Sequence, residues 1–253
     1  MSTLNEKTAF ITGGGRGIGR AIALTFSGAG ATVVVAGRNR EALDDVCATI
    51  EQRGGRAVAV TCDVADPTQV YAAVSTARAA VGPFDILVNN AGITYSAKLT
   101  DTDDALWERI IQVNLNGAYY CCKAIVPDMI ARGGGRIINI ASMAALVGMP
   151  FSAAYSAAKH GLLGLTRSLA LELQRYHITA NAICPAWVDT DMMTNAINAL
   201  AVKTGRTPEE AREALLSRGG QQRAMSPEEV AITALRLAGP DGAATTGEAI
   251  VLH

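Results

Sequence analysis

The sequence lacks the features that mark several large classes of protein. Its net charge is −1, so no excess of basic residues points to a nucleic acid or an anionic membrane as partner. No uninterrupted apolar run reaches the ~18 residues that a membrane-spanning helix needs. The first ten residues, MSTLNEKTAF, contain no basic stretch followed by a long apolar one, so we expect no secretory signal.

Cysteine is scarce and is not arranged for the usual cysteine chemistry. The number of cysteines is odd and no two of them form a C-x-x-C pair, so we expect neither a disulfide framework nor a zinc site, and no metal. This usage favours a reducing compartment, and we expect the protein to be cytoplasmic. The five are Cys47, Cys62, Cys121, Cys122 and Cys184.

Apolar residues make up 49% of the 253 residues, enough for the core of a single α/β domain over residues 1–253. Short β-branched runs alternate with longer amphipathic stretches, and the runs are apolar on successive residues, as in strands covered on both faces. We therefore predict a Rossmann-type, doubly wound parallel sheet of about seven strands with helices on both faces. The predicted strands are 8–12, 32–36, 57–61, 86–89, 136–140, 179–183 and 249–252, and helical patterns begin near Ile18, Arg40, Pro67, Thr102 and Ser152.

The segment 189–225 interrupts this alternation. It carries helical patterns and many charges but no strand. An excursion of this length inside a compact α/β domain is typical of a binding element, so we predict a helical substrate lid. A surface insertion without a binding role is the alternative.

Five of the seven residues from Gly13 to Gly19 are glycine. A phosphate-binding P-loop would continue with lysine and then serine or threonine, where this chain has Arg20 and Ala21. The spacing G-x-G-x-x-G fits no register either. The pattern T-G-x-x-x-G-I-G does fit from Thr12, and it joins a predicted strand to a helix whose first N–H groups can bind a pyrophosphate.

Further motifs follow this loop in order. They are NNAG at 89–92, NLNG at 114–117, Ser142 after the fifth predicted strand, YSAAK at 155–159 and CPAWVDT at 184–190. Together with the glycine loop, this set resembles the short-chain dehydrogenase/reductase family over essentially the whole chain.

The resemblance implies four catalytic residues: Asn114, Ser142, Tyr155 and Lys159. Tyr155 would exchange a proton with the substrate oxygen, Ser142 would hydrogen-bond that oxygen, and Asn114 would support a water-linked proton relay through Lys159. Tyr155 and Lys159 are four residues apart and share one helix face, where an ammonium group would lower the pKa of the phenol. Asn114 as a simple core amide is the alternative, and Ser142 as a nucleophile is disfavoured because no G-x-S-x-G surrounds it.

The cofactor is partly specified by the residues after the second predicted strand. Relatives that prefer NAD place an acidic residue there, whereas this chain has Gly37 and then Arg38. Arginine binds phosphate through paired hydrogen bonds, and Arg16 would bring a second positive charge, so NADP(H) is favoured and NAD(H) stays possible. Ordinary surface arginines are the alternative. The resemblance implies cofactor contacts from Gly13, Arg16, Gly17, Ile18, Gly19, Arg38, Asp63, Val64, Asn90, Ala91, Gly92, Tyr155, Lys159, Pro185, Val188 and Thr190.

One position departs from the family pattern. Ala186 stands where relatives usually have glycine. Alanine would be strained there if the backbone needed a positive φ.

The resemblance implies an NADP(H)-dependent oxidoreductase that interconverts a ketone and a secondary alcohol by hydride transfer. The ketone could be a 3-oxoacyl thioester, including one of CoA. An NAD-dependent dehydrogenase of secondary alcohols or 3-hydroxy acids is the alternative, and a non-catalytic nucleotide-binding regulator is an alternative of another class.

The apolar side chains near the predicted site favour a substrate with hydrocarbon character, unless they only pack the lid. Relatives also imply a homotetramer or homodimer built on the helices that begin near Thr102 and Ser152. The apolar residues in question are Met143, Phe151, Trp187, Met192 and Met193.

Overall fold

The computed structural model describes residues 3–253, and its centre is a seven-stranded sheet in the order β3-β2-β1-β4-β5-β6-β7. Every neighbouring pair of strands is parallel. The strand order reverses between β1 and β4, which opens a crevice at the carboxyl ends of the strands. The strands are β1 (Thr8–Thr12), β2 (Thr32–Gly37), β3 (Arg56–Thr61), β4 (Ile86–Asn89), β5 (Gly135–Ile140), β6 (Ile178–Pro185) and β7 (Ala249–Leu252).

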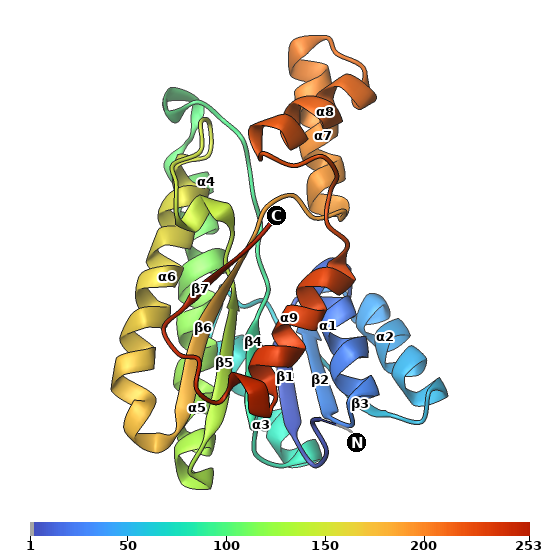
Figure 1. The fold of residues 1–253 in the computed structure, drawn as a ribbon, viewed down its shortest axis with the longest axis vertical. Coiled ribbons are helices and arrows are strands. Elements are labelled where there is room, and N and C mark those ends of the chain that lie inside the picture. Colours follow the sequence, from blue (N-terminus) through green and yellow to red (C-terminus); the bar gives the residue numbers. More distant parts are fainter. Residues whose placement is uncertain (1–2) are drawn as a thin grey trace.

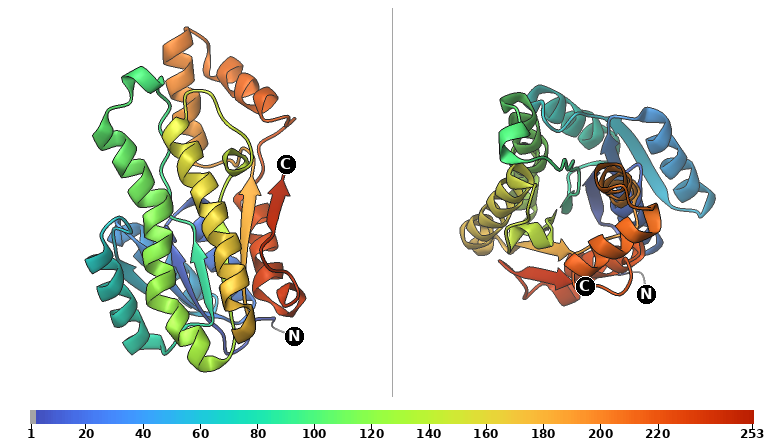
Figure 2. Two further views of the ribbon diagram at one scale, coloured as in Figure 1. Left: turned by 90° about the vertical axis from the view of Figure 1, so that its left-hand side faces the viewer. Right: turned by 90° about the horizontal axis from the view of Figure 1, so that it is seen from above.

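Helices cover both faces of the sheet (Figures 1 and 2). One face carries α1 (Gly17–Gly28), α2 (Arg40–Gln52) and α9 (Pro227–Ala238), and the other carries α3 (Pro67–Val81), α5 (Gly117–Arg132) and α6 (Ala153–Leu173). The short helix α4 (Asp104–Ile111) packs against α6. Each face has its own buried apolar cluster, which is why the central strands are apolar on consecutive residues. This arrangement confirms the predicted fold class.

Capping residues set where the helices begin. Asp66 accepts hydrogen bonds from the backbone N–H groups of Thr68 and Gln69, and Pro67 occupies the first turn, so α3 begins at the predicted residue. The helix predicted near Thr102 begins instead at Asp104, because Asp103 caps it by accepting a 2.7 Å bond from the N–H of Leu106. The predicted strands are all present, and β6 extends beyond its prediction to Pro185.

The segment 189–225 forms two helices, α7 (Asp191–Thr204) and α8 (Pro208–Arg218), with a small apolar core of their own. Figure 1 shows this pair, coloured orange, standing beyond the carboxyl ends of the strands. We call residues 189–225 the lid segment. Its only strand-like contact is an isolated bridge between Val188 and Met225 at its base. None of the helices in residues 3–253 is long and apolar enough to cross a membrane.

Candidate active site

The glycine loop and the NNAG turn form one unit where β1 and β4 end. The side-chain amide of Asn90 donates to the carbonyls of Thr12 at 2.9 Å and Gly13 at 3.2 Å. In return, the Thr12 hydroxyl accepts from the N–H groups of Asn90 and Ala91, both at 3.0 Å. These bonds join residues 78 positions apart in sequence, so the two motifs are fixed to each other at the switch point.

Two positions in this loop demand glycine. Gly13 has φ +64°, and a Cβ there would lie 2.8 Å from the amide nitrogen of Asn90. A Cβ at Gly19 would collide with the carbonyl oxygen of Gly13. This close packing places the N-terminus of α1 at the open edge of the sheet, where its first N–H groups can face an anionic group.

Lys159 belongs to α6, on the other side of the crevice from the glycine loop. It is 3% exposed, and its Nζ donates a 2.8 Å hydrogen bond to the carbonyl of Ile140, the last residue of β5. Burial lowers the pKa of Lys159 from 10.5 to about 8. The ammonium therefore stays charged at neutral pH but loses its proton within the range of ordinary assays.

Tyr155 lies one turn before Lys159 on α6, with 5.6 Å between Nζ and the centroid of the phenol ring. Burial raises the pKa of the Tyr155 phenol above its ordinary value, and the neighbouring Ser142 side chain opposes this only in part. The predicted lowering of this pKa by Lys159 is not what the structure gives. Desolvation of the partly buried phenol is the largest effect on its pKa.

Ser142 stands at the end of β5 as the cap of the short 3₁₀ turn Met143–Ala145. Its Oγ accepts a 3.1 Å hydrogen bond from the N–H of Ala144, and its side chain lies close enough to Tyr155 to lower the pKa of the phenol. The two hydroxyl groups that the sequence places 13 residues apart thus meet across the crevice. Such a pair can hold a substrate oxygen between two donors.

Asn114 lies in a π-helical turn, Gln112–Asn116, between α4 and α5, and the sequence pattern alone indicated only a helix here. Its side-chain amide donates to the carbonyls of Ile93 and Ile110, both at 2.9 Å. A Cβ at Gly92 would lie 2.8 Å from Asn114 Oδ1 and 3.8 Å from Lys159 Nζ, so Asn114 and Lys159 converge on Gly92. Single π-helical turns are frequent at functional sites. The relay role of Asn114 stays a prediction.

At the end of β3, Asp63 is engaged by a residue that the sequence analysis missed. Arg109 of α4 donates a 2.7 Å hydrogen bond to Asp63 Oδ2, and the N–H of Ala65 donates to Oδ1 at 3.0 Å. Burial raises the pKa of Asp63, but the bonds from Arg109 and Ala65 and the charge of Arg38 lower it further, to below its ordinary value. Arg38 therefore lies near enough to Asp63 for its positive charge to lower the pKa of the Asp63 carboxyl group. No sequence pattern around Arg109 indicates that it pairs with Asp63, because a single arginine on an amphipathic helix is usually exposed to solvent.

The base of the lid segment touches the glycine loop. A Cβ at Gly17 would lie 3.2 Å from the methyl group of Thr190. Arg16 Nη1 lies 3.1 Å from Oδ2 of Asp191 and forms an ion pair with it. Asp191 is the first residue of α7. Ala186 has no positive φ, so the strain considered for it does not arise.

Three of the apolar residues predicted near the substrate, Met193, Trp187 and Phe151, have different surroundings. Met193 is buried in the core of the lid segment, and Trp187 packs against that core, so both support the lid. Phe151 is different: it is exposed, has φ +62°, and accepts a hydrogen bond on its carbonyl from the N–H of Ala97. Lys203 of α7 lies over its ring, with 5.2 Å from Nζ to the centroid. Phe151 therefore contacts the loop that contains Ala97 through its carbonyl and α7 of the lid segment through its ring.

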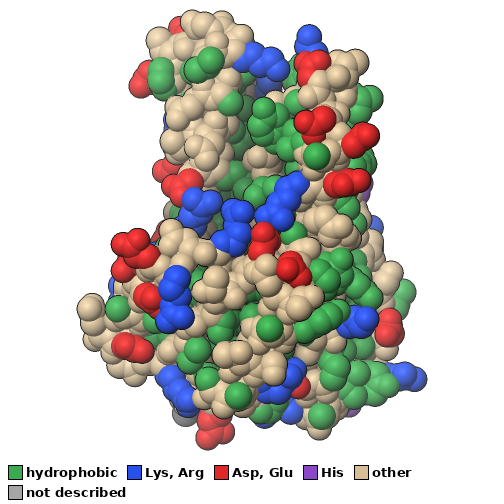
Figure 3. All heavy atoms as spheres, turned by 180° about the vertical axis from the view of Figure 1, so that it is seen from behind, with side chains coloured by type: hydrophobic (Ala, Val, Ile, Leu, Met, Phe, Trp, Pro, Cys, Tyr) green, Lys and Arg blue, Asp and Glu red, His purple; other side chains and the backbone are tan. Residues whose placement is uncertain are grey.

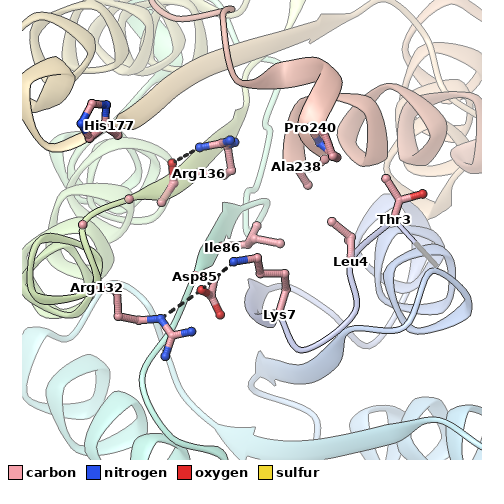
Figure 4. A pocket seen from close by; sticks show the side chains of 14 residues that line it. Thr3, Leu4, Lys7, Asp85, Ile86, Arg132, Arg136, His177, Ala238 and Pro240 are labelled. Carbon is pink, nitrogen blue, oxygen red and sulfur yellow. Dashed lines mark hydrogen bonds and ion pairs between the residues drawn. The ribbon is translucent and has the colours of Figure 1, made fainter. Parts of the chain in front are cut away.

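A cleft of about 490 Å³ opens at the amino ends of the strands, where β1, β4 and β5 begin (Figure 4). Asp85 lies there with its Oδ1 accepting from Lys7 at 3.4 Å and from Arg132 at 3.0 Å. The basic side chains are close to the C-terminal ends of α5 and α9, whose negative dipole ends they complement. None of the predicted site residues lines this cleft, so it is not the candidate active site.

The face that carries the crevice is visible from behind in Figure 3. The molecule is hollowed between two upper lobes, and Lys and Arg side chains gather at the foot of this hollow. The carboxyl ends of the parallel strands, the phenol–hydroxyl pair and an adjacent basic region form an arrangement suited to a dinucleotide and a carbonyl compound.

Comparison with known proteins agrees with this chemistry. The family model described as short chain dehydrogenase matches residues 7–200. D-beta-hydroxybutyrate dehydrogenase of Rhizobium meliloti (strain 1021) is 39% identical over 246 residues, which cover 95% of each chain. A 3-oxoacyl-(acyl-carrier-protein) reductase of Thermotoga maritima is 36% identical and covers 98% of this chain and 96% of the relative. A solved structure of an actinorhodin polyketide ketoreductase variant with NADPH is 36% identical, has a TM-score of 0.93, and covers 100% of this chain and 97% of that one.

Proposed function

The chain belongs to the short-chain dehydrogenase/reductase family and is an NAD(P)-dependent oxidoreductase, and from this premise we propose that it reduces ketones to secondary alcohols with NADPH. The observation that carries the proposal is the meeting of Ser142 and the partly buried Tyr155 beside Lys159 at the carboxyl ends of the strands. A phenol of ordinary pKa is protonated at neutral pH and can give its proton to the oxygen of a ketone, which suits the reductive direction.

NADPH, when bound, supplies the hydride that the carbonyl carbon accepts. Ser142 donates a hydrogen bond to the carbonyl oxygen and stabilises the negative charge that develops there. Tyr155 then gives its phenolic proton to that oxygen, which yields the alcohol and a phenolate. The charge of Lys159 stabilises this phenolate, and Asn114, which converges with Lys159 on Gly92, supports the return of a proton through Lys159.

The preference for NADP(H) rests on Arg38 and Arg16. Gly37 ends β2 where an acidic residue would otherwise repel a 2′-phosphate, and Arg38 follows it directly. Arg38 is exposed and lies near Asp63, the residue expected beside the adenine. The solved ketoreductase structure, which contains NADPH, supports the same choice.

For the substrate, we propose an apolar ketone, and a 3-oxoacyl thioester is one candidate class. Phe151, four residues before Tyr155, offers an exposed ring, and Lys203 beside it offers a positive charge. An NAD-dependent 3-hydroxy acid dehydrogenase is the second candidate, favoured by the D-beta-hydroxybutyrate dehydrogenase relative.

We further propose that the protein is cytoplasmic and forms a homotetramer or homodimer. Large apolar side chains are exposed on the helices expected at the interface, notably Trp107 on α4 and Leu171 on α6, which is 80% exposed. A second subunit would remove these side chains from water. Light scattering that shows only a monomer would contradict the oligomer.

The experiment that tests the cofactor choice is a fluorescence titration of NADPH and NADH with the parent, Arg38→Ala and Arg53→Ala. Arg53 is a matched control, because it is an exposed arginine at the other end of α2. We expect the parent to bind NADPH more tightly than NADH, and Arg38→Ala to lose most of that difference because a charged hydrogen bond is worth about 1.5–3 kcal/mol. NADH binding as tight as NADPH in the parent would favour the dehydrogenase alternative.

A further inference from the structure

Arg16 occupies a position between two parts of the molecule. On one side, a Cβ at Gly15 would lie 3.2 Å from the Cβ of Ala42, in the first turn of α2. On the other side, a Cβ at Gly17 would lie 3.2 Å from the methyl group of Thr190, at the base of the lid segment. The residue between these two glycines can therefore direct a long side chain toward either neighbour.

In the structure, the Arg16 side chain faces the lid segment. Its Nη1 lies 3.1 Å from Asp191 Oδ2, and the two side chains are 75% and 65% exposed. Arg16 makes no side-chain hydrogen bond to the N-terminus of α1, and among residues 3–253 its only ion pair is the one with Asp191. An exposed pair of this kind is weak and easily exchanged for another partner.

We infer that Asp191 is a specificity-determining residue for the cofactor, because it competes with a 2′-phosphate for Arg16. This inference rests on the proposed use of NADP(H), in which Arg16 and Arg38 hold that phosphate. Binding of a cofactor with a 2′-phosphate transfers the Arg16 guanidinium from Asp191 to the phosphate. A cofactor without that phosphate leaves the ion pair in place.

The competition couples the cofactor to the lid segment. Asp191 begins α7, so a 2′-phosphate that takes Arg16 also removes one of the contacts between the lid base and the glycine loop. Coupling free energies are reciprocal, so a lid segment that lacks the carboxylate should bind this cofactor more tightly.

The test is a fluorescence titration of NADPH and NADH with the parent, Asp191→Asn and Asp189→Asn. Asp189 is the matched control, since it is an exposed carboxylate two residues away whose ion pair, at 3.6 Å, is with Arg212. We expect Asp191→Asn to lower the Kd of NADPH about two- to fivefold, the range that corresponds to an exposed ion pair, and to leave the Kd of NADH unchanged. An unchanged Kd for NADPH, or an equal change for both cofactors, would overturn the inference.

A second arm separates competition for Arg16 from direct repulsion between Asp191 and the phosphate. In an Arg16→Gln background, Asp191→Asn should no longer change the Kd of NADPH, because no guanidinium is left to release. If Asp191→Asn lowers the Kd of NADPH in that background as much as in the parent, the carboxylate acts directly on the phosphate and the inference fails. Thermal unfolding of each variant verifies that the fold is kept.

The parent distinguishes failure of the inference from failure of the proposed function. If the parent prefers NADPH and Asp191→Asn changes nothing, the inference fails alone. If the parent binds both cofactors equally and Asp191→Asn still tightens NADPH, the proposed cofactor preference fails alone. If neither effect is seen, both are wrong.

Discussion

The edge of the sheet that would hold the cofactor and the lid segment above it are built in different ways. At the sheet edge, Thr12 and Asn90 lock the glycine loop to the NNAG turn through four hydrogen bonds to the ends of parallel strands. The lid segment has its own small core and meets the glycine loop and the Phe151 loop through the exposed pairs of Arg16 with Asp191 and of Lys203 with Phe151. Partly buried hydrogen bonds between strand ends are costly to break, whereas exposed ion pairs are worth little. The glycine loop and the NNAG turn are thus held rigidly, whereas the lid segment can shift at little cost in free energy.

The largest effect should come from the fixed edge, with Tyr155→Phe. Removing the phenolic hydroxyl removes the proton donor, so we expect turnover to fall by about 10²- to 10⁴-fold while the Kd of NADPH stays within about twofold. NADPH oxidation with a panel of ketones, followed by absorbance, measures the rate. Tyr71→Phe, an exposed tyrosine on α3, is the control. Reduction by Tyr155→Phe at the parent rate would refute the mechanism.

A smaller effect, also from the fixed edge, concerns the stability of the free protein. Because burial lowers the pKa of Lys159 to about 8, the folded protein loses this proton between about pH 8 and 10 while the unfolded chain keeps it. Stability therefore rises with pH in that window. The free energy of unfolding of the parent, relative to Lys159→Met, should increase by about 2–3 kcal/mol from pH 7 to pH 10.

Urea unfolding at the two pH values measures this difference. Lys123→Met, on the exposed surface of α5, is the control and should track the parent at both. A difference between the parent and Lys159→Met that does not change with pH would mean that Lys159 titrates normally.

The smallest effect should come from the lid segment, with Lys203→Met. The variant keeps the apolar stem but loses the cation over the Phe151 ring, an interaction worth about 0.5–1 kcal/mol at exposed sites. We expect KM for a ketone to change by no more than about fivefold and kcat to stay near the parent value. Lys203→Arg should retain the parent KM, because arginine can make the same contact. A loss of kcat as large as that of Tyr155→Phe would show that the lid segment takes part in the chemistry. The difference between the sheet edge and the lid segment would then not hold.

Sequence patterns predicted the features that depend on neighbouring residues. Apolar runs located every strand, and the Pro67 start of α3 followed from a local cap. The pairing of Arg109 with Asp63 was not predictable, because it joins a helix to a strand end 46 residues away. The burial of Met193 inside the lid depends on how α7 packs against α8, which no periodicity reveals.

The sequence by itself determined the parallel sheet, the glycine loop and the order of the motifs, because strand patterns, capping residues and turn glycines act over a few residues. Only the tertiary structure decided the electrostatics. The pKa of the Tyr155 phenol depends on its desolvation and on Ser142, which lies on a different element of the fold. The partner of Arg16 was decided in the same way, since it depends on where the base of the lid segment rests.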